Sequence, residues 1–246
     1  MKLGQLVPNS VKSSSLYRRL HPRALFNAFR KPADVFTKIY ATNDWGGEHG
    51  VLYSGSGSRG TPAEEYVALI KNFISQHNVR NVLDLGCGDF FIGRHIAAAS
   101  DHYVGIDVVP AVIRQHQATY GSDKVKFDCL DITRDALPTA ELCLIRQVLQ
   151  HLSNRQIASV IQRLGQFKHV IVSEHYPHPN EFKAPNLDTA AGAGTRVTFG
   201  SAVVLDQPPF SISCTELSRS AAPQRDDGLQ DSYTRGSIRT FLVHPK

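Results

Sequence analysis

A short glycine turn flanked by acidic residues is the first feature of the sequence that suggests chemistry. The turn Gly86-Cys87-Gly88 follows an apolar run, and its glycines would let the backbone bend tightly and approach a ligand. Carboxylates at Asp84 and Asp89 would oppose a pyrophosphate but would tolerate a ligand with positive charge. The dinucleotide fingerprint lacks its third glycine because Phe91 stands there, and no P-loop Gly-Lys-Ser/Thr follows.

Two further acidic residues each follow a later apolar run. Asp107 stands nineteen residues after Gly88, where a carboxylate can accept hydrogen bonds from both hydroxyl groups of a ribose. Asp131 could meet an adenine amino group while Ile132 packs on the ring. The arrangement therefore favours an adenosine that carries a cationic, amino-acid-bearing arm over a nucleotide.

Alternating strand and helix patterns would position these residues. Apolar runs that predict strands lie at 81–85, 103–107, 124–128, 142–146 and 169–173. Helical patterns between most of them predict βαβ units in a mainly parallel sheet, with ligands at the carboxyl ends of the strands.

Helix starts and two later β-like runs complete the expected elements. Thr61 is expected to cap a helix, with Pro62 at its first position and Glu64 in a capping box, and another helix is expected to begin near Ser153. The runs 196–205 and 237–245 predict an antiparallel pair at the end of the sheet. Residues 215–235 would connect them or form a surface excursion.

Four segments resemble the successive motifs of the class I S-adenosylmethionine-dependent methyltransferases, in order and at the family spacing. They are VLDLGCGDF, YVGIDVVPAVI, KFDCLDI and LCLIRQVLQHLS, and the resemblance covers about residues 61–175. It implies an α/β, Rossmann-like, doubly wound, mostly parallel seven-stranded sheet with an antiparallel last strand. It also implies S-adenosyl-L-methionine as the cofactor, with Gly86 and Gly88 against its methionine part and Asp84 near its amino group. The residues expected to bind this cofactor are Asp84, Gly86, Cys87, Gly88, Asp107, Val108, Asp131, Ile132 and Arg146.

The segment at 39–58 resembles a bacterial subgroup in which an Asn-x-Trp-Gly and a Ser-Gly-x-Gly-Ser stretch precede the methyltransferase core. The subgroup is of the small-molecule or glycan type. Trp45 would cover the cofactor or substrate pocket, with the Ser54–Ser58 loop folded over it, or it would anchor the N-terminal segment on the core. Both interpretations stay open at this point.

Methyl transfer from a sulfonium is an in-line displacement, and a hydroxyl acceptor usually needs a general base. The candidates are His151 after the fourth strand and Glu174 with His175 after the fifth. Helix packing or a cofactor contact is the alternative for His151. Arg146 could also hold a substrate carboxylate or phosphate, or form a structural ion pair.

Two features of the sequence indicate which class of methyl acceptor to expect: the motifs that are missing after the fourth strand, and the distribution of charge. The fourth strand is followed by Arg-Gln and not by the Asn/Asp-Pro-Pro-aromatic signature of base methylation, and no Pro-Cys supplies a nucleophile for cytosine. The net charge of +5 combines +7 over residues 1–40 with −2 over the rest, so the body lacks a basic face for nucleic acid. We therefore expect methylation of a small molecule or glycan at oxygen. The alternatives are a catalytically degenerate module that docks through the basic arm, and an RNA methyltransferase guided by that arm.

The chain is expected to divide into a basic helical N-terminal arm with a cap-like segment over 1–58 and a methyltransferase domain over 59–246. The arm would contact an anionic surface or be solvated. No apolar run reaches the roughly 20 residues that cross a bilayer, and no export signal is evident. The four cysteines, which have no metal-ligand or redox spacing, are expected to be reduced thiols in a cytoplasmic protein.

Overall fold

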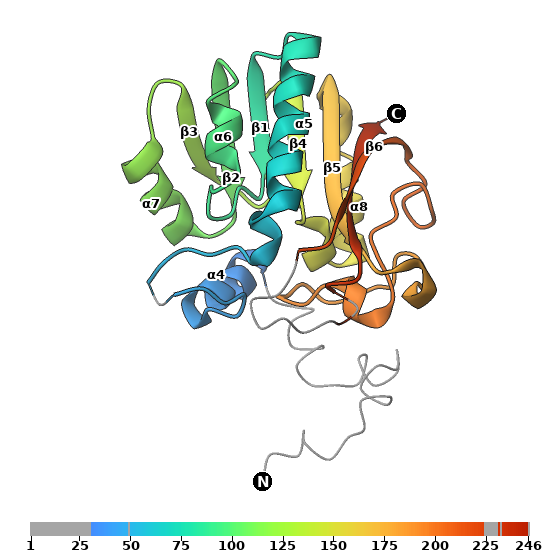
Figure 1. Cartoon of the computed structure of the whole chain (residues 1–246). Helices are drawn as coiled ribbons and strands as arrows, with labels where there is room; N and C mark the ends of the chain where they lie inside the picture. The colour runs from blue at the N-terminus through green and yellow to red at the C-terminus, as the bar shows by residue number, and fades with distance from the viewer. Residues whose placement is uncertain (1–30, 49, 224–230, 232, 246) are drawn as a thin grey trace.

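A seven-stranded sheet forms the centre of the computed structural model, which describes residues 31–245 apart from 49, 224–230 and 232 (Figure 1). The strand order is β3-β2-β1-β4-β5-β7-β6. The strands are β1 Asn81–Leu85, β2 His102–Asp107, β3 Val125–Cys129, β4 Leu142–Arg146, β5 His169–Tyr176, β6 Ser213–Ala221 and β7 Ser237–His244. β1 to β5 are parallel, and β7 lies antiparallel between β5 and β6. The expected Rossmann-like sheet with an antiparallel last strand is confirmed.

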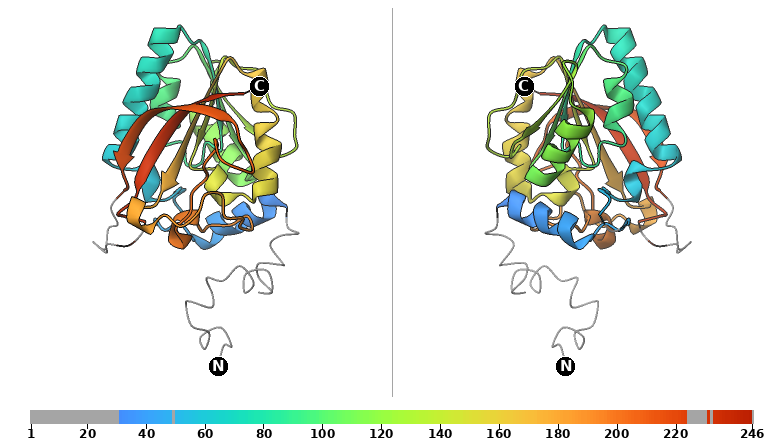
Figure 2. Two further views of the ribbon diagram at one scale, coloured as in Figure 1. Left: turned by 90° about the vertical axis from the view of Figure 1, so that its right-hand side faces the viewer. Right: turned by 90° about the vertical axis from the view of Figure 1, so that its left-hand side faces the viewer.

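Helices cover both faces of this sheet (Figure 2). The helices are α4 Pro32–Thr42, α5 Thr61–His77, α6 Gly93–Ala97, α7 Pro110–Tyr120 and α8 Asn154–Ile161. α5, α6 and α7 pack on one face, where Ile96 and Ile113 join the same apolar cluster, and α8 packs on the other. Strands covered on both sides must be apolar on both sides, which explains why four consecutive residues of β4, Leu142–Ile145, are buried.

The ends of two helices test the expected caps. Ser153 caps α8 in a reciprocal capping box, because its hydroxyl accepts from the Gln156 backbone and Gln156 Oε1 accepts from the Ser153 backbone. The expected cap of α5 is wrong: Gly60 is the N-cap, Thr61 is already helical, and no side chain caps the helix. Pro62 does lie in the first turn, where its missing N–H is no loss.

The prediction for 196–205 is also wrong. Residues Arg196–Phe199 form a 3-10 helix that ends at Gly200 with φ +71°, a conformation that glycine adopts readily. The strand beside β7 is instead β6, which overlaps the start of the segment expected to be a connection. β6 lies at the edge of the sheet and has half-exposed polar residues along its length, so it does not read as an apolar run.

The carboxyl ends of the parallel strands lie at the same end of the molecule as α4 and the segment around residues 179–205 (Figure 1). Within the described residues, no helix is long and apolar enough to cross a membrane. The basic segment 1–30 lies outside the described residues, so the arm and its contacts stay predictions.

Candidate cofactor and acceptor site

A cavity of about 800 Å³ opens at the carboxyl ends of the parallel strands. All nine residues that the sequence predicts as cofactor ligands line this cavity, although they come from four strands and the loops that follow them. The structure therefore brings the predicted set together in one place.

The glycine turn forms one wall. Gly86 and Gly88 have φ values of +83° and +57°, and the backbone N–H groups of Gly86 and Cys87 both donate to the carbonyl of Ile106 at 2.8 Å. A Cβ on Gly86 would lie 2.4 Å from Val148 Cγ2, and one on Gly88 would lie 2.5 Å from Ser54 Oγ. The turn therefore needs glycine for two reasons. Its backbone has positive φ values, and the side chains of Val148 and Ser54 pack directly against it.

Two buried carboxyl groups stand on either side of this turn. Asp84 accepts a hydrogen bond from the Tyr103 hydroxyl at 2.5 Å, and Asp107 accepts from the backbone N–H groups of Gly88 at 3.3 Å and Val109 at 2.9 Å. Each residue is 8% exposed. Burial raises the pKa of both carboxyl groups to about 6, because water no longer stabilises the charged form.

Asp131 and Ile132 lie at the far end of the cavity, after β3. Asp131 Oδ1 accepts from the backbone and the hydroxyl of Thr133, and Oδ2 lies 3.3 Å from the Arg134 guanidinium. The carboxylate is thus held in one orientation by its own loop, beside the apolar side chain of Ile132.

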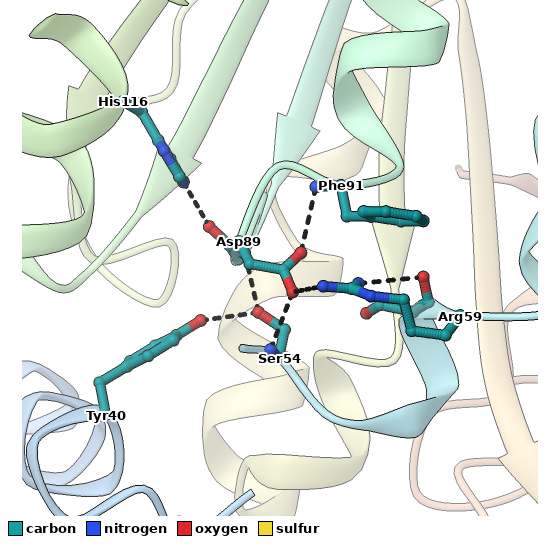
Figure 3. A network of polar contacts seen from close by, with 8 residues as sticks. Tyr40, Ser54, Arg59, Asp89, Phe91 and His116 are labelled. Atoms are coloured by element: carbon teal, nitrogen blue, oxygen red, sulfur yellow. Dashed lines mark hydrogen bonds and ion pairs between the residues drawn. The ribbon is translucent and has the colours of Figure 1, made fainter. Parts of the chain in front are cut away.

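Asp89 does not offer a free charge to the cavity. Its Oδ2 accepts from the backbone of Ser54 at 3.0 Å and from Arg59 Nη2 at 2.9 Å, as Figure 3 shows. Its backbone N–H donates to Ser54 Oγ, which also contacts the Tyr40 hydroxyl. The argument that Asp89 would repel a pyrophosphate therefore fails, because Arg59 compensates its charge. The network instead fastens the Ser54–Ser58 loop to the glycine turn.

Trp45 lines the cavity and also joins α4 to the core. Its ring centroid lies 5.2 Å from Tyr40 and 5.3 Å from His151, and Nε1 donates to the Ala193 carbonyl at 3.2 Å. The position of Trp45 is compatible with both interpretations. Its side chain lines the cavity, and it also anchors α4, which precedes the core.

Of the three predicted bases, His151 alone lines the cavity. Its Nδ1 lies 3.1 Å from the carbonyl of Gly192, so this nitrogen carries the proton, and Nε2 is left with a lone pair 3.3 Å from Gln150 Nε2. Burial lowers the pKa of His151 to about 4, which keeps the imidazole neutral at pH 7.

Glu174 and His175 lie outside the cavity lining. Glu174 accepts hydrogen bonds from the backbone of Leu149 at 2.9 Å and Gln150 at 3.2 Å, and the ring of His175 packs 4.4 Å from that of Tyr233. The structure does not bring these two residues to the place where a methyl acceptor would bind.

Arg196 was missed by the sequence reasoning. It is 1% exposed and donates to the carbonyls of Leu149, Gln150, Leu152 and Leu187 and to Asn154 Oδ1. One available signal was a charged residue at the start of an apolar run. Its position in the fold could not be inferred, since its partners lie up to 47 residues away.

Comparisons with known proteins agree with this architecture. Residues 83–167 match the model of a family described as a methyltransferase domain. TehB from Haemophilus influenzae is 12% identical with a TM-score of 0.50, over 72% of this chain and 61% of TehB. N-methyltransferase NodS from Bradyrhizobium japonicum WM9, solved with S-adenosyl-L-homocysteine, is 19% identical with a TM-score of 0.49, over 75% of this chain and 88% of NodS. No curated protein matches the chain.

The strand order defines the fold, and the match over residues 83–167 is to a methyltransferase domain. The chain has the Rossmann-like fold of the class I methyltransferases.

Proposed function

We propose that the protein transfers a methyl group from S-adenosyl-L-methionine to an oxygen atom of a small molecule or glycan. The observation that carries the proposal is the shared cavity, in which the glycine turn, Asp107 and Asp131 lie in the order that an extended adenosine derivative needs. Along the sheet, β3 and β2 would hold the adenosine, and β1 would hold the amino-acid part.

The residues present fit this cofactor. The Asp107 carboxylate is held by two backbone N–H groups and faces the cavity, where it would accept hydrogen bonds from the ribose hydroxyls. Val108 would pack beside the ribose, and Asp131 with Ile132 would border the adenine. Asp84 would lie near the ammonium group, and no Cβ at Gly86 or Gly88 narrows the cavity there.

When bound, the cofactor supplies a methyl group on a sulfonium, which leaves by in-line displacement. The protein must then align the acceptor and keep water out. Trp45 and the Ser54–Ser58 loop line the cavity and would restrict the entry of water. His151 Nε2 accepts a hydrogen bond from Gln150 Nε2 at 3.3 Å, and its lone pair would accept the proton of an acceptor hydroxyl in place of that bond as the new bond forms.

Titration calorimetry with S-adenosylhomocysteine tests the cofactor assignment. Asp107→Ala removes the ribose acceptor, and each lost hydrogen bond to a charged group corresponds to about 1.5–3 kcal/mol, or about tenfold or more in affinity. Asp101→Ala is the matched control, because Asp101 is 69% exposed at the opposite end of β2. Equal affinity in the two variants, or no binding by folded wild-type protein, would refute the assignment.

Mass spectrometry tests the transfer itself. Cell extract incubated with protein and cofactor should yield a product that is heavier by one CH₂ group, and fragmentation should place that group on oxygen. A methylated nitrogen or carbon would contradict the oxygen assignment, and cofactor binding without any product would favour a binding module.

A further inference from the structure

Buried polar atoms without hydrogen-bond partners gather at the β4 end of the cavity. They are Tyr66 Oη, Arg146 Nε, Gln147 Nε2 and Gln150 Oε1, and all four side chains line the cavity. Buried polar groups in folded proteins are nearly always hydrogen-bonded, and an unpaired one costs about 1–3 kcal/mol. Four side chains that line one end of the cavity thus each carry an unpaired polar atom, which favours a polar ligand there.

Arg146 brings a positive charge to this group. Its Nη2 donates to the carbonyl of Gly57 at 2.7 Å, but within the described residues no ion pair joins Arg146 to a carboxylate. The two acids close enough to act on it electrostatically, Asp84 and Glu174, already accept hydrogen bonds from other groups. A guanidinium stays charged even when burial lowers its pKa, so an anion is its natural partner.

The surroundings hold these donors in place. The Arg146 guanidinium lies 5.0 Å from the centroid of the Tyr66 ring, and the cation–π contact helps to fix its orientation. Gln147 has φ +56°, which is uncommon for a residue with a side chain. A Cβ on Gly57 would lie 2.0 Å from Gln147 Oε1, so the Ser54–Ser58 loop packs directly on this side chain.

The position of the group separates it from the proposed cofactor residues. Asp131, Asp107 and Asp84 follow or end β3, β2 and β1, and Arg146 ends β4, the next strand in the sheet. A cofactor that extends from β3 toward β1 would place its sulfonium between the ribose and the amino-acid part. We place the acceptor beside His151, which lines the same cavity as Arg146 and Gln150.

We propose that Arg146, Gln147 and Tyr66 bind a carboxylate or phosphate group of the methyl acceptor, and that the acceptor is a small hydroxylated anion such as a sugar acid or sugar phosphate. Gln150 Oε1 accepts a hydrogen bond from a hydroxyl group of the same molecule. The inference rests on the proposed function, because it takes the cofactor to occupy the β1–β3 end of the cavity.

The experiment uses the protein saturated with S-adenosylhomocysteine and the fluorescence of Trp45, which is the one tryptophan of the chain and lines the cavity. The probes are D-glucuronate, D-glucose 6-phosphate and inorganic phosphate, with D-glucose as the neutral control. At least one anion should change the fluorescence saturably, and D-glucose should bind at least about tenfold more weakly.

Arg146→Met should abolish the anion response, and Tyr66→Phe, which keeps the ring, should weaken it about three- to tenfold. Arg80→Met is the matched control, because Arg80 is 73% exposed away from the cavity.

A second titration shows which molecule carries the anion. If the acceptor carries it, Arg146→Met binds S-adenosylhomocysteine within about twofold of wild type. Weaker binding of S-adenosylhomocysteine with unchanged binding of 5′-methylthioadenosine, which lacks the amino-acid part, would assign Arg146 to the cofactor carboxylate and overturn the proposal. No saturable response to any of the three anions, in protein that binds S-adenosylhomocysteine, would also overturn it. Failure of wild-type protein to bind S-adenosylhomocysteine would instead contradict the proposed function.

Discussion

Glu174 and Arg196 bind the backbone of the same turn, Leu149–His151, through its N–H groups and its carbonyl groups respectively. The carboxylate of Glu174 accepts from the backbone N–H groups of Leu149 and Gln150, and the guanidinium of Arg196 donates to the carbonyls of the same two residues. The turn carries Gln150 and His151 to the cavity. Glu174 is therefore a positioning residue for the side chain beside the acceptor.

Arg196→Met should lower the free energy of unfolding strongly. Four backbone carbonyls and Asn154 Oδ1 would lose their donor in a buried place, and Glu174 would lose a nearby positive charge. Removing one partner from a buried charged network typically costs about 3–5 kcal/mol. Urea unfolding measures the change, with the exposed Arg155→Met as the matched control. A loss below about 1 kcal/mol would show that the Arg196 contacts are not needed for stability.

Asp107→Asn should remove a pH-dependent loss of stability while it weakens cofactor binding, although its amide keeps only one of the two oxygens that accept backbone N–H groups. The folded-state pKa of Asp107, about 6, is above the ordinary aspartate value of 3.8, so the folded state holds the proton more tightly. The stability that this carboxyl group contributes is therefore complete below pH 4 and is lost as the pH rises to about 6. A shift of this size corresponds to about 2–3 kcal/mol, and asparagine avoids the loss because it has no charge to bury.

Urea unfolding between pH 4 and pH 7 tests this prediction. The difference in the free energy of unfolding between Asp107→Asn and wild type should grow in favour of the variant across the interval pH 4–6, and then stay constant. Other titrating groups cancel in this difference. A difference that does not change with pH would mean that Asp107 ionises as easily in the folded protein as in the unfolded chain.

The strands β1, β2, β4 and β5 could be predicted from sequence because inner strands of a parallel sheet are buried on both faces and form apolar runs. β3 lies at an edge with mostly exposed residues, and the alternation of Val125 and Phe127 with polar residues indicates it. β6 could not be predicted this way, because an edge strand with one neighbour keeps polar residues such as Thr215 and Arg219. The run at Arg196 is misleading for a related reason. Val197 is buried in a 3-10 turn, and Val203 and Leu205 after it pack into the core, so the run is apolar without being a strand.

The expected cofactor residues could be predicted because each ends or closely follows a recognisable strand, so local sequence and sheet topology suffice. The roles of Asp89 and Glu174 depend on partners distant in the chain. Asp89 is neutralised by Arg59, thirty residues earlier, and Glu174 binds a turn about 25 residues earlier. Such contacts are set by packing, and neither composition nor spacing indicates them.

Asp89→Ala should loosen the Ser54–Ser58 loop and weaken cofactor binding. The variant removes the acceptor for Ser54 N–H and the ion-pair partner of Arg59, which together fasten the loop to the turn at Gly88. We expect the affinity for S-adenosylhomocysteine to fall about tenfold, mainly through faster dissociation. Stopped-flow fluorescence of Trp45 measures both rates, with the exposed Asp123→Ala as the matched control. Unchanged dissociation in Asp89→Ala would show that the network does not retain the ligand.

His151→Ala should slow methyl transfer without changing cofactor affinity. The Nε2 lone pair is the basic group placed in the cavity beside the proposed acceptor, and removal of a general base typically costs about 10²–10⁴-fold in rate. Because the pKa of His151 is about 4, the wild-type rate should be independent of His151 ionisation near pH 7 and fall as the pH approaches 4. Single-turnover rates with the acceptor found by mass spectrometry test this, and His175→Gln is the matched control because His175 is buried outside the cavity. Equal rates in the two variants would remove His151 from the mechanism, and the acceptor would then have to lose its proton to water or arrive already ionised.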